Sequence, residues 1–535
     1  MSESLKNNIF SISLGTTLSK LLGFLRQIFI AAAFGVGLTY DAYNYAYIIP
    51  GFLIIIIGGI NGPLHNSIVT VLTPLKIKKA RQILQNIIFK ILLFSIIIGT
   101  LIFLNAEVII KIIGPNLDNE TQFLAARQLK ILSLCIPLSG FNGLSYGALN
   151  SRNRFFISSL SPAIVSIVTI IFITFYWLFN SESNIDNNIF YSELLALATL
   201  AGTFIQTLIQ IFETYKIGLF KFKFNFRHRF SEENRIIKLI LPSSLSSGLG
   251  QINVFVDMFF ASSFKGAASG LAYGNFLIQA PLGILSNSLI LPILPKLSEL
   301  KGQKNFEEYY LILLKSIEYC LLGTFLMMGI FIALNNQIVD LFYQRGAFNS
   351  EAANLVKKIL IAYSLGLPAY LFRDLLIRIY YSIEVTKLPF KLSLFGIGLN
   401  IFFDWILVGA PTKNIENLLP FNYGVVGLVL SSGIVNLIVS IILSIGLSKH
   451  IKSLPHIILI KKTILITLAT LLSISFSFCI INLYNPINPI NQIINLFIGS
   501  FTYFFIYFVS TRFFKVNKFT LSDKVNLNKI FQNIL

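Results

Sequence analysis

Long apolar runs constrain this chain more than any other feature of its sequence. Four windows carry no charge and are long enough to cross a hydrocarbon layer, which takes about 20 helical residues: 155–179, 194–212, 319–338 and 425–447. Hydrophobic residues make up 55% of the 535 and charged residues only 12%, a balance typical of proteins embedded in lipid.

Weaker apolar windows are interrupted by Gly, Pro or single charges, and bring the expected number of membrane helices to about fourteen. They are 9–34, 43–72, 91–105, 129–149, 236–260, 271–294, 355–383, 392–407, 463–484 and 490–509. The first run continues through Lys20 and Arg26 without a cleavage pattern, so we expect it to be retained as a helix. The sequence therefore predicts an all-α polytopic membrane protein.

The positive charge, formally +19, is distributed unevenly between the loops that connect the predicted helices. Lys and Arg cluster after every even-numbered window, whereas the odd-numbered loops are acidic or nearly uncharged. The positive-inside rule then places both termini and the even-numbered loops in the cytoplasm, with the chain in the plasma (inner) membrane. This distribution favours contact with anionic lipid headgroups and does not indicate nucleic-acid binding.

One loop alternates aromatic and basic residues over 220–227. This pattern fits a strip that lies in the headgroup layer, and it equally fits a basic linker between two halves of the protein.

Cysteine and histidine do not indicate a metal, a cofactor or a disulfide framework. Cys135, Cys320 and Cys479 are far apart in sequence, and the four histidines show no ligand spacing. We expect no cofactor, and the sequence leaves open whether a coupling ion or the membrane potential supplies energy.

Two stretches about 230 positions apart resemble one another. Ala31 to Gly35, with Pro50, is echoed by Ala261 to Gly266, with Pro281, and a second echo links 146–151 to 380–383. A parallel repeat predicts two pseudo-symmetric six-helix lobes, 1–219 and 220–450, followed by two appended helices and a basic cytoplasmic tail over 451–535.

Charged residues within apolar spans are expensive, so each needs a partner or a water-filled cavity. Lys20 and Arg26 in the first window could line a cavity that receives an anionic group such as a diphosphate. Alternatively, Lys20 could snorkel to the membrane surface, or Arg26 could pair with Asp41. The interrupted stretch 57–63 predicts a broken second helix, which also favours a central passage.

Further polar residues lie in the later windows. Asp257 follows a run of serines that could simply pack helices closely, and Asn275 and Gln279 share a helical face. We assign these three, with Lys20, Arg26 and Asp41, to a candidate substrate cavity.

A second group has either a gating or a structural role by this reading. Asp374 and Arg378 have the spacing of a local ion pair, near Arg373, and Asp404 lies in the next window.

Three separated motifs resemble the MurJ/MviN family of the superfamily of multidrug, oligosaccharidyl-lipid and polysaccharide exporters. They are the opening segment 17–26 with Phe34-Gly35 and Asp41-Ala42, the element Gln344-Arg345-Gly346-Ala347-Phe348, and 378–382 with Thr386 and Pro389. The resemblance covers roughly the whole chain and looks like a cyanobacterial form. It adds Arg345 to the residues with a possible gating or structural role.

The resemblance implies a flippase, not an enzyme, whose substrate is lipid II, the undecaprenyl-diphosphate-linked peptidoglycan precursor. Many members of the family carry arginines where this chain has Ile54 and Asn275, so the expected cavity is less cationic. Membrane lipids are expected partners, and other cell-wall synthesis proteins are further candidates.

Two other functions remain open on the sequence. The same fold could export another lipid-linked oligosaccharide or an amphipathic small molecule, and a non-transporting scaffold of a cell-wall complex is also compatible. A membrane glycosyltransferase would need a large acid-rich external loop, which the sequence does not show.

Overall fold

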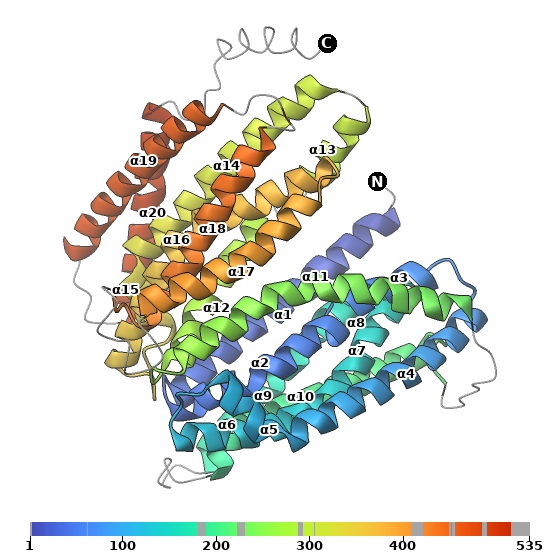
Figure 1. The fold of residues 1–535 in the computed structure, drawn as a ribbon. Helices are drawn as coiled ribbons and strands as arrows, with labels where there is room; N and C mark the ends of the chain where they lie inside the picture. The colour runs from blue at the N-terminus through green and yellow to red at the C-terminus, as the bar shows by residue number, and fades with distance from the viewer. Residues whose placement is uncertain are drawn as a thin grey trace. The chain divides into compact units, whose positions relative to one another are not determined.

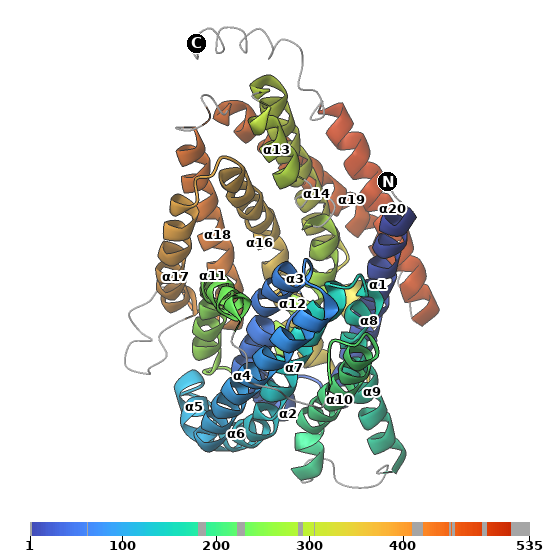
Figure 2. The same cartoon turned by 90° about the vertical axis from the view of Figure 1, so that its right-hand side faces the viewer.

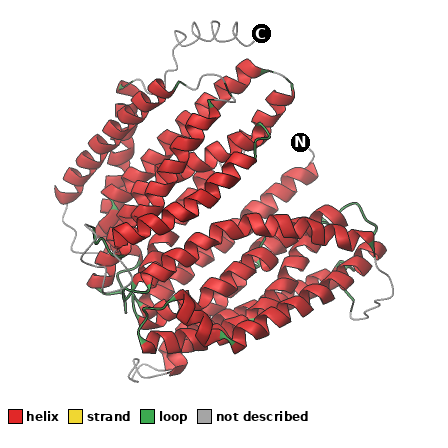
Figure 3. Ribbon diagram, in the orientation of Figure 1, coloured by secondary structure: helices red, strands yellow, loops and turns green. Residues whose placement is uncertain are grey.

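The structure is a computed structural model that describes residues 3–60, 62–179, 189–221, 230–286, 293–303, 305–408, 421–448, 451, 455–483 and 489–514. Within these ranges every regular element is a helix (Figure 3). The prediction of an all-α membrane protein is confirmed. The alternating aromatic and basic loop lies outside the described residues from position 222 onward, as does the basic tail from 515.

The chain divides into two compact units (Figure 1). The first comprises Met1–Ser269 with Arg345–Asn349, and the second comprises Gly270–Gln344 with Ser350–Leu535. The two units are defined by how the helices pack. The first unit includes the long helix Ser231–Ala261, which the predicted boundary at 219/220 places in the second lobe. The boundaries of the predicted lobes therefore stay a prediction.

Among its described residues, the first unit holds eleven α-helices and a π-helical turn, and α12 begins at its end. Their bounds are α1 Glu3–Phe34, α2 Leu38–Leu53, η1 Ile54–Gly58, α3 Pro63–Leu72, α4 Ile77–Leu104, α5 Ala106–Ile113, α6 Asn119–Ser133, α7 Cys135–Asn150, α8 Phe155–Leu160, α9 Pro162–Phe179, α10 Ile189–Lys216 and α11 Ser231–Ala261. Figures 1 and 2 show α9 and α10 side by side.

The second unit contains the rest of α12 and the helices that follow it. Their bounds are α12 Ala267–Leu285, α13 Ile293–Gly302, α14 Phe306–Ala333, α15 Asn335–Phe342, α16 Ser350–Ser382, α17 Lys387–Val408, α18 Val425–Leu447, α19 His456–Leu483 and α20 Pro489–Phe513. The two appended helices, α19 and α20, each contact α14 through a polar side chain. Lys462 on α19 forms a buried ion pair of 2.8 Å with Glu318, and the hydroxyl of Tyr507 on α20 donates to the carbonyl of Leu322.

Eleven described helical segments are long and apolar enough to cross a membrane. The other three predicted windows, 129–149, 236–260 and 271–294, are also largely helical but do not meet that standard. The first of them is interrupted between α6 and α7, and α11 in the second carries a run of serines. The count of fourteen therefore remains a prediction.

The backbone agrees with the predicted internal repeat. Left-handed conformations occur at Gly35 and Gly266, 231 positions apart, and again at Asn153 and Glu384, also 231 apart. Outside glycine this conformation is uncommon, so its recurrence at matched positions indicates that the two copies turn in the same way.

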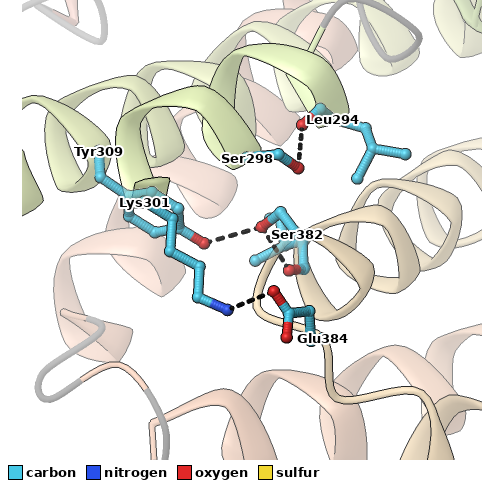
Figure 4. Close-up of polar contacts among 7 residues, drawn as sticks. Leu294, Ser298, Lys301, Tyr309, Ser382 and Glu384 are labelled. Atoms are coloured by element: carbon cyan, nitrogen blue, oxygen red, sulfur yellow. Dashed lines mark hydrogen bonds and ion pairs between the residues drawn. The ribbon is translucent and has the colours of Figure 1, made fainter. Parts of the chain in front are cut away.

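Glu384 takes this strained conformation just after α16, at the position where helices commonly end in glycine (Figure 4). The amide of Val385 donates to the carbonyl of Tyr380, which closes the helix end. Two contacts hold the turn: Lys301 on α13 pairs with Glu384 at 3.3 Å, and Tyr309 and Ser382 share a hydrogen bond of 3.0 Å.

The predicted break in the second membrane helix is confirmed. α2 passes into the π-helical turn of Ile54–Gly58, and Gly59 is extended before α3 begins at Pro63. The turn packs closely on α7, because a Cβ on Gly143 would lie 2.0 Å from the carbonyl oxygen of Ile57. π-Helical turns are rare and frequently mark functional sites.

Polar and basic side chains of α4 bind the beginning of α11. Asn86 donates to Glu233 at 2.7 Å, Lys90 pairs with the same carboxylate, and Lys79 pairs with Glu232. Burial acts to raise the pKa of Glu233, but the hydrogen bonds from Asn86 and Lys90 outweigh it and hold the pKa below its usual value.

Replacing Glu233 with glutamine is expected to lower the free energy of unfolding by about 1–2 kcal/mol near neutral pH, because the charge-assisted bonds are lost. Since the folded-state pKa is depressed, this contribution is present above the ordinary glutamate value of about 4.3 and disappears as the pH falls through the folded value. Thermal unfolding of the purified variant against pH measures both effects.

The matched control is Glu107→Gln, which removes an exposed carboxylate paired with Lys130 at 2.9 Å. Exposed pairs contribute about 0–1 kcal/mol, so this variant should melt close to the parent. A gap between Glu233→Gln and the parent that stays constant down to about pH 3 would contradict the assignment.

Candidate functional site

Arg26 is the central residue of the candidate site. It lies within the apolar membrane span Ser11–Phe34, on α1, and is half-buried. Its Nε is buried and has no hydrogen-bond partner among the described residues. Because an isolated guanidinium in a membrane is costly, this arrangement fits a side chain that awaits an anionic ligand or lines a wet cavity.

Three tyrosines form a stacked ladder on one face of α2. Tyr40 and Tyr43 have ring centroids 6.2 Å apart, and Tyr43 and Tyr47 have centroids 5.7 Å apart, with the rings within 16° of parallel in both pairs. The ladder meets α1 at Tyr40, whose hydroxyl contacts Gln27, the residue that follows Arg26. The spacing i, i+3, i+7 puts the rings on one helical face.

Neighbouring polar groups form hydrogen bonds with the hydroxyls of Tyr40 and Tyr43. The amide nitrogen of Gln27 donates to the hydroxyl of Tyr40 at 2.8 Å. The hydroxyls of Tyr43 and Thr199 are 3.0 Å apart, and since Thr199 already donates to the carbonyl of Leu195, Tyr43 is the donor. The Tyr47 hydroxyl makes no hydrogen bond with a described residue.

Asp41 holds the beginning of α12 and does not pair with Arg26. Its buried carboxylate accepts hydrogen bonds from the backbone amide of Gly266 at 2.6 Å and from the amide and hydroxyl of Ser269 at 2.8 and 2.7 Å. The carboxylate thus satisfies amides that a helix start leaves open, and its charge is favourable there. The alternative of an Arg26 to Asp41 ion pair is wrong in this structure.

The remaining cavity candidates lie in both units. Lys20 is exposed on α1, and Asp257 is half-buried on α11 at a position 231 residues after Arg26. Asn275 and Gln279 are exposed on α12 and bond to one another at 3.3 Å, as their spacing predicts. A shared cavity for these residues stays a prediction.

The second group of candidates lies mainly on α16. Arg378 and Asp374 form the predicted pair at 3.3 Å. Arg373 instead donates to the side-chain oxygen of Asn436 on α18 at 2.6 Å, and its guanidinium lies 5.6 Å from the centre of the Tyr370 ring. The partners of Arg373 that the structure places here are thus neutral.

Asp404 is fully buried within a polar group that α17 and α18 share. Asn400 donates to its carboxylate at 2.9 Å and Ser431 donates to it as well, while Ser432 donates to Asn400 at 3.2 Å. These hydrogen bonds offset part of the free-energy cost of burying the Asp404 carboxylate, which supports a structural role for Asp404 within the second unit.

Arg345 belongs to a short segment that packs in the first unit, the five residues Arg345–Asn349. The amide of Ala347 donates to the carbonyl of Ala32 at 2.8 Å, near the end of α1. The approach is so close that a Cβ on Gly35 would lie 2.3 Å from the carbonyl oxygen of Ala347, and a Cβ on Gly346 would lie 2.3 Å from that of Ala32. Both glycines also have positive φ, so other side chains would be strained there.

Sequence reasoning missed the tyrosine ladder, Gln27 as its support, and the polar partners of Asp404. The i, i+3, i+7 spacing of the tyrosines on α2 is a signal that could have revealed the ladder. Among the described residues, no group of three or more His, Cys, Asp or Glu side chains could hold a metal ion.

The fold and this polar interior define the class of protein. An inward-facing multidrug transporter of the MATE family, in the MOP superfamily, matches with a TM-score of 0.63 at 16% identity over 83% of this chain and 98% of its own. A solved lipid II flippase MurJ in the inward closed conformation matches with a TM-score of 0.73 at 27% identity, covering 94% of this chain and 98% of that one. The fold is therefore that of a MOP-type transporter.

Sequence comparison identifies the family. The profile for lipid II flippase MurJ matches residues 30–501. A probable lipid II flippase MurJ of Synechocystis is 36% identical over 440 residues, which cover 82% of this chain and 80% of the relative, and one of Buchnera aphidicola is 29% identical over 515 residues. The chain belongs to the lipid II flippase MurJ family, as its motifs predicted, and is a multi-pass protein of the inner membrane.

Proposed function

We propose that this chain moves lipid II from the cytoplasmic to the outer face of the plasma membrane by alternating access. Family membership supports the substrate, and both MurJ and MATE relatives support the transport mechanism. The observation that carries the proposal within this chain is Arg26, a half-buried cation whose Nε lacks a partner within an apolar span.

In this mechanism Arg26 binds the diphosphate, since its planar fork of donors matches phosphate oxygens. Lys20 adds a second, more exposed positive charge, and Asn275 and Gln279 offer hydrogen bonds to sugar or peptide. The polyprenyl tail stays in lipid while the headgroup crosses.

Both termini lie in the cytoplasm under this proposal, as the distribution of Lys and Arg predicts. With no cofactor, the membrane potential or an ion gradient drives transport. Each net negative charge moved outward through 100 mV gains about 2.3 kcal/mol.

Expression of this chain in a bacterium depleted of its own lipid II flippase tests the function. We expect growth and wall synthesis to be restored. If the inserted protein restores neither but changes surface polysaccharide, the exporter of another lipid-linked oligosaccharide takes precedence. If an Arg26→Ala variant restores both as well as the parent, the non-transporting scaffold takes precedence.

A further inference from the structure

We infer that His65 binds the proton that drives transport, so that lipid II moves outward as a proton moves inward. This inference rests on the proposed function and names its coupling ion, which neither the motifs nor the family comparison indicates. His65 lies in the first turn of α3, just after the break in the second membrane helix, and is only 4% exposed. All the residues that form its hydrogen-bond network lie in the first unit.

Amide side chains engage both ring nitrogens of His65. Nδ1 lies 3.0 Å from the side-chain oxygen of Asn66, which can only accept, so Nδ1 carries the proton. Nε2 lies 2.8 Å from the side-chain nitrogen of Asn150 on α7, which can only donate, so Nε2 offers its lone pair. The structure therefore holds the imidazole in its neutral state, and Nε2 is the atom that takes a further proton.

The group beyond Asn150 can accommodate that proton. The hydroxyl of Ser158 on α8 has two acceptors within reach, the side-chain oxygen of Asn150 at 2.9 Å and the carbonyl oxygen of Arg154 at 3.2 Å. When Nε2 gains a proton, the Asn150 amide can turn over, so that its oxygen accepts from Nε2 and its nitrogen donates to Ser158. The Ser158 hydroxyl then donates to Arg154 alone, and each of these polar groups keeps a partner in both protonation states.

The elements around His65 carry few other titratable groups. The elements packed on α3 are η1, α7 and α11, and α8 is joined to them through Asn150. η1 and α8 carry none, and α7 carries only the thiol of Cys135 and the phenol of Tyr146. The ionised groups are two arginines beside α8 and five residues of α11: Arg152, Arg154, Glu232, Glu233, Arg235, Lys238 and Asp257.

These ionised groups already have other partners or environments. Arg152 donates to the carbonyl of Leu75 at 2.8 Å, and lysines of α4 pair with both glutamates of α11. Arg154, Arg235 and Lys238 are exposed. Among the described residues of these elements, His65 is the side chain whose ordinary titration range lies near neutral pH.

Protonation of His65 acts on α3 because of where the charge is placed. A cation in the first turn of a helix is disfavoured by the helix dipole, and the amide partners of His65 are neutral. The π-helical turn and extended Gly59 separate α3 from α2, so α3 can tilt independently. Proton binding therefore favours a position of α3 that exposes His65 to water, and the conformation of this structure favours release.

The test measures how lipid II distributes between the two leaflets of vesicles that contain the full chain, with the membrane potential held at zero by equal K⁺ concentrations and valinomycin. One pH unit changes the free energy of a proton by a factor equivalent to about tenfold, so with the parent the ratio of lipid II on the acidic side to that on the alkaline side should rise about tenfold. This equilibrium ratio does not depend on the orientation of the protein in the vesicle.

His65→Gln keeps a hydrogen-bonding side chain that cannot take a proton, so its ratio should not respond to the pH gradient. The matched control is His456→Gln, which removes the histidine at the start of α19 and should respond like the parent.

Nitrogen NMR of the histidine side chains in the parent protein tests proton binding in lipid without any substitution. The His65 ring should carry its proton on Nδ1 at about pH 8 and become fully protonated as the pH falls toward about 5. A ring that stays neutral throughout this range overturns the inference.

The transport outcomes separate this inference from the proposed function. If the parent equilibrates lipid II but the pH gradient leaves the ratio unchanged, or if His65→Gln responds like the parent, the coupling role of His65 is refuted while the flippase function stands. If the parent moves no lipid II between the leaflets under any condition, the proposed function fails and the inferred coupling fails with it, even where the NMR shows that His65 titrates.

Discussion

Replacing Arg26 with alanine is expected to abolish exposure of lipid II on the outer leaflet, with a loss of at least about a hundredfold in transport rate. Removing the guanidinium deletes a charge-assisted contact to phosphate, worth about 1.5–3 kcal/mol, and leaves the headgroup charge uncompensated in the span. Arg26→Lys should retain partial activity, because an ammonium keeps the charge but not the fork of donors. Transport of lipid II into the outer leaflet of reconstituted vesicles measures both variants.

The control for this prediction is Arg154→Ala, which removes an exposed arginine after α7. It should transport like the parent. Arg26→Ala should also reach the membrane in parental amount, since its Nε makes no hydrogen bond that the variant would break among the described residues. Parental transport by Arg26→Ala would contradict the role of this arginine.

Replacing Asp41 with alanine is expected to lower the free energy of unfolding by about 2–4 kcal/mol, the largest stability effect predicted here. The variant leaves the amides of Gly266 and Ser269 and the Ser269 hydroxyl without their acceptor in a buried place. Asp41→Asn should lose less, because its amide oxygen can still accept one or two of these bonds. Thermal unfolding of the purified variants in detergent or nanodiscs gives the order.

Asp118→Ala provides the comparison for a helix cap in an exposed position. Its carboxylate accepts from the Thr121 amide at 2.9 Å at the start of α6. Water can replace that contact, so the loss should be about 1 kcal/mol. Equal destabilisation by the two variants would show that Asp41 acts as an ordinary exposed cap and that its burial adds nothing.

Much of the fold follows from the sequence because the lipid solvent imposes simple rules. Length, apolar runs and the need to satisfy every backbone group predict helices throughout. The similar stretches around Gly35 and Gly266 also predict the repeat, and the structure gives both glycines a positive φ. Helices α11 and α12 are harder to predict as spans, since their serines and interruptions weaken the apolar signal.

The candidate site is less predictable, because it depends on which side chains meet across helices. Because a charge within a membrane span is costly, the sequence suggested an ion pair between Arg26 and Asp41. Only the structure shows that the Asp41 carboxylate instead accepts hydrogen bonds from Gly266 and Ser269 at the start of α12, at least 225 positions further along the chain. Tyrosine is common in membrane helices, so the sequence alone did not distinguish the ladder of α2 from ordinary packing. Arg378 and Asp374 were paired correctly because their contact is local.

The most direct test of the central claim is the amount of lipid II on the outer leaflet of flippase-depleted cells that express either this chain or its Arg26→Ala variant at equal membrane abundance. We expect the parent to restore exposure and the variant not to restore it. Failure of a correctly inserted parent to restore any exposure would contradict the claim that this chain moves lipid II.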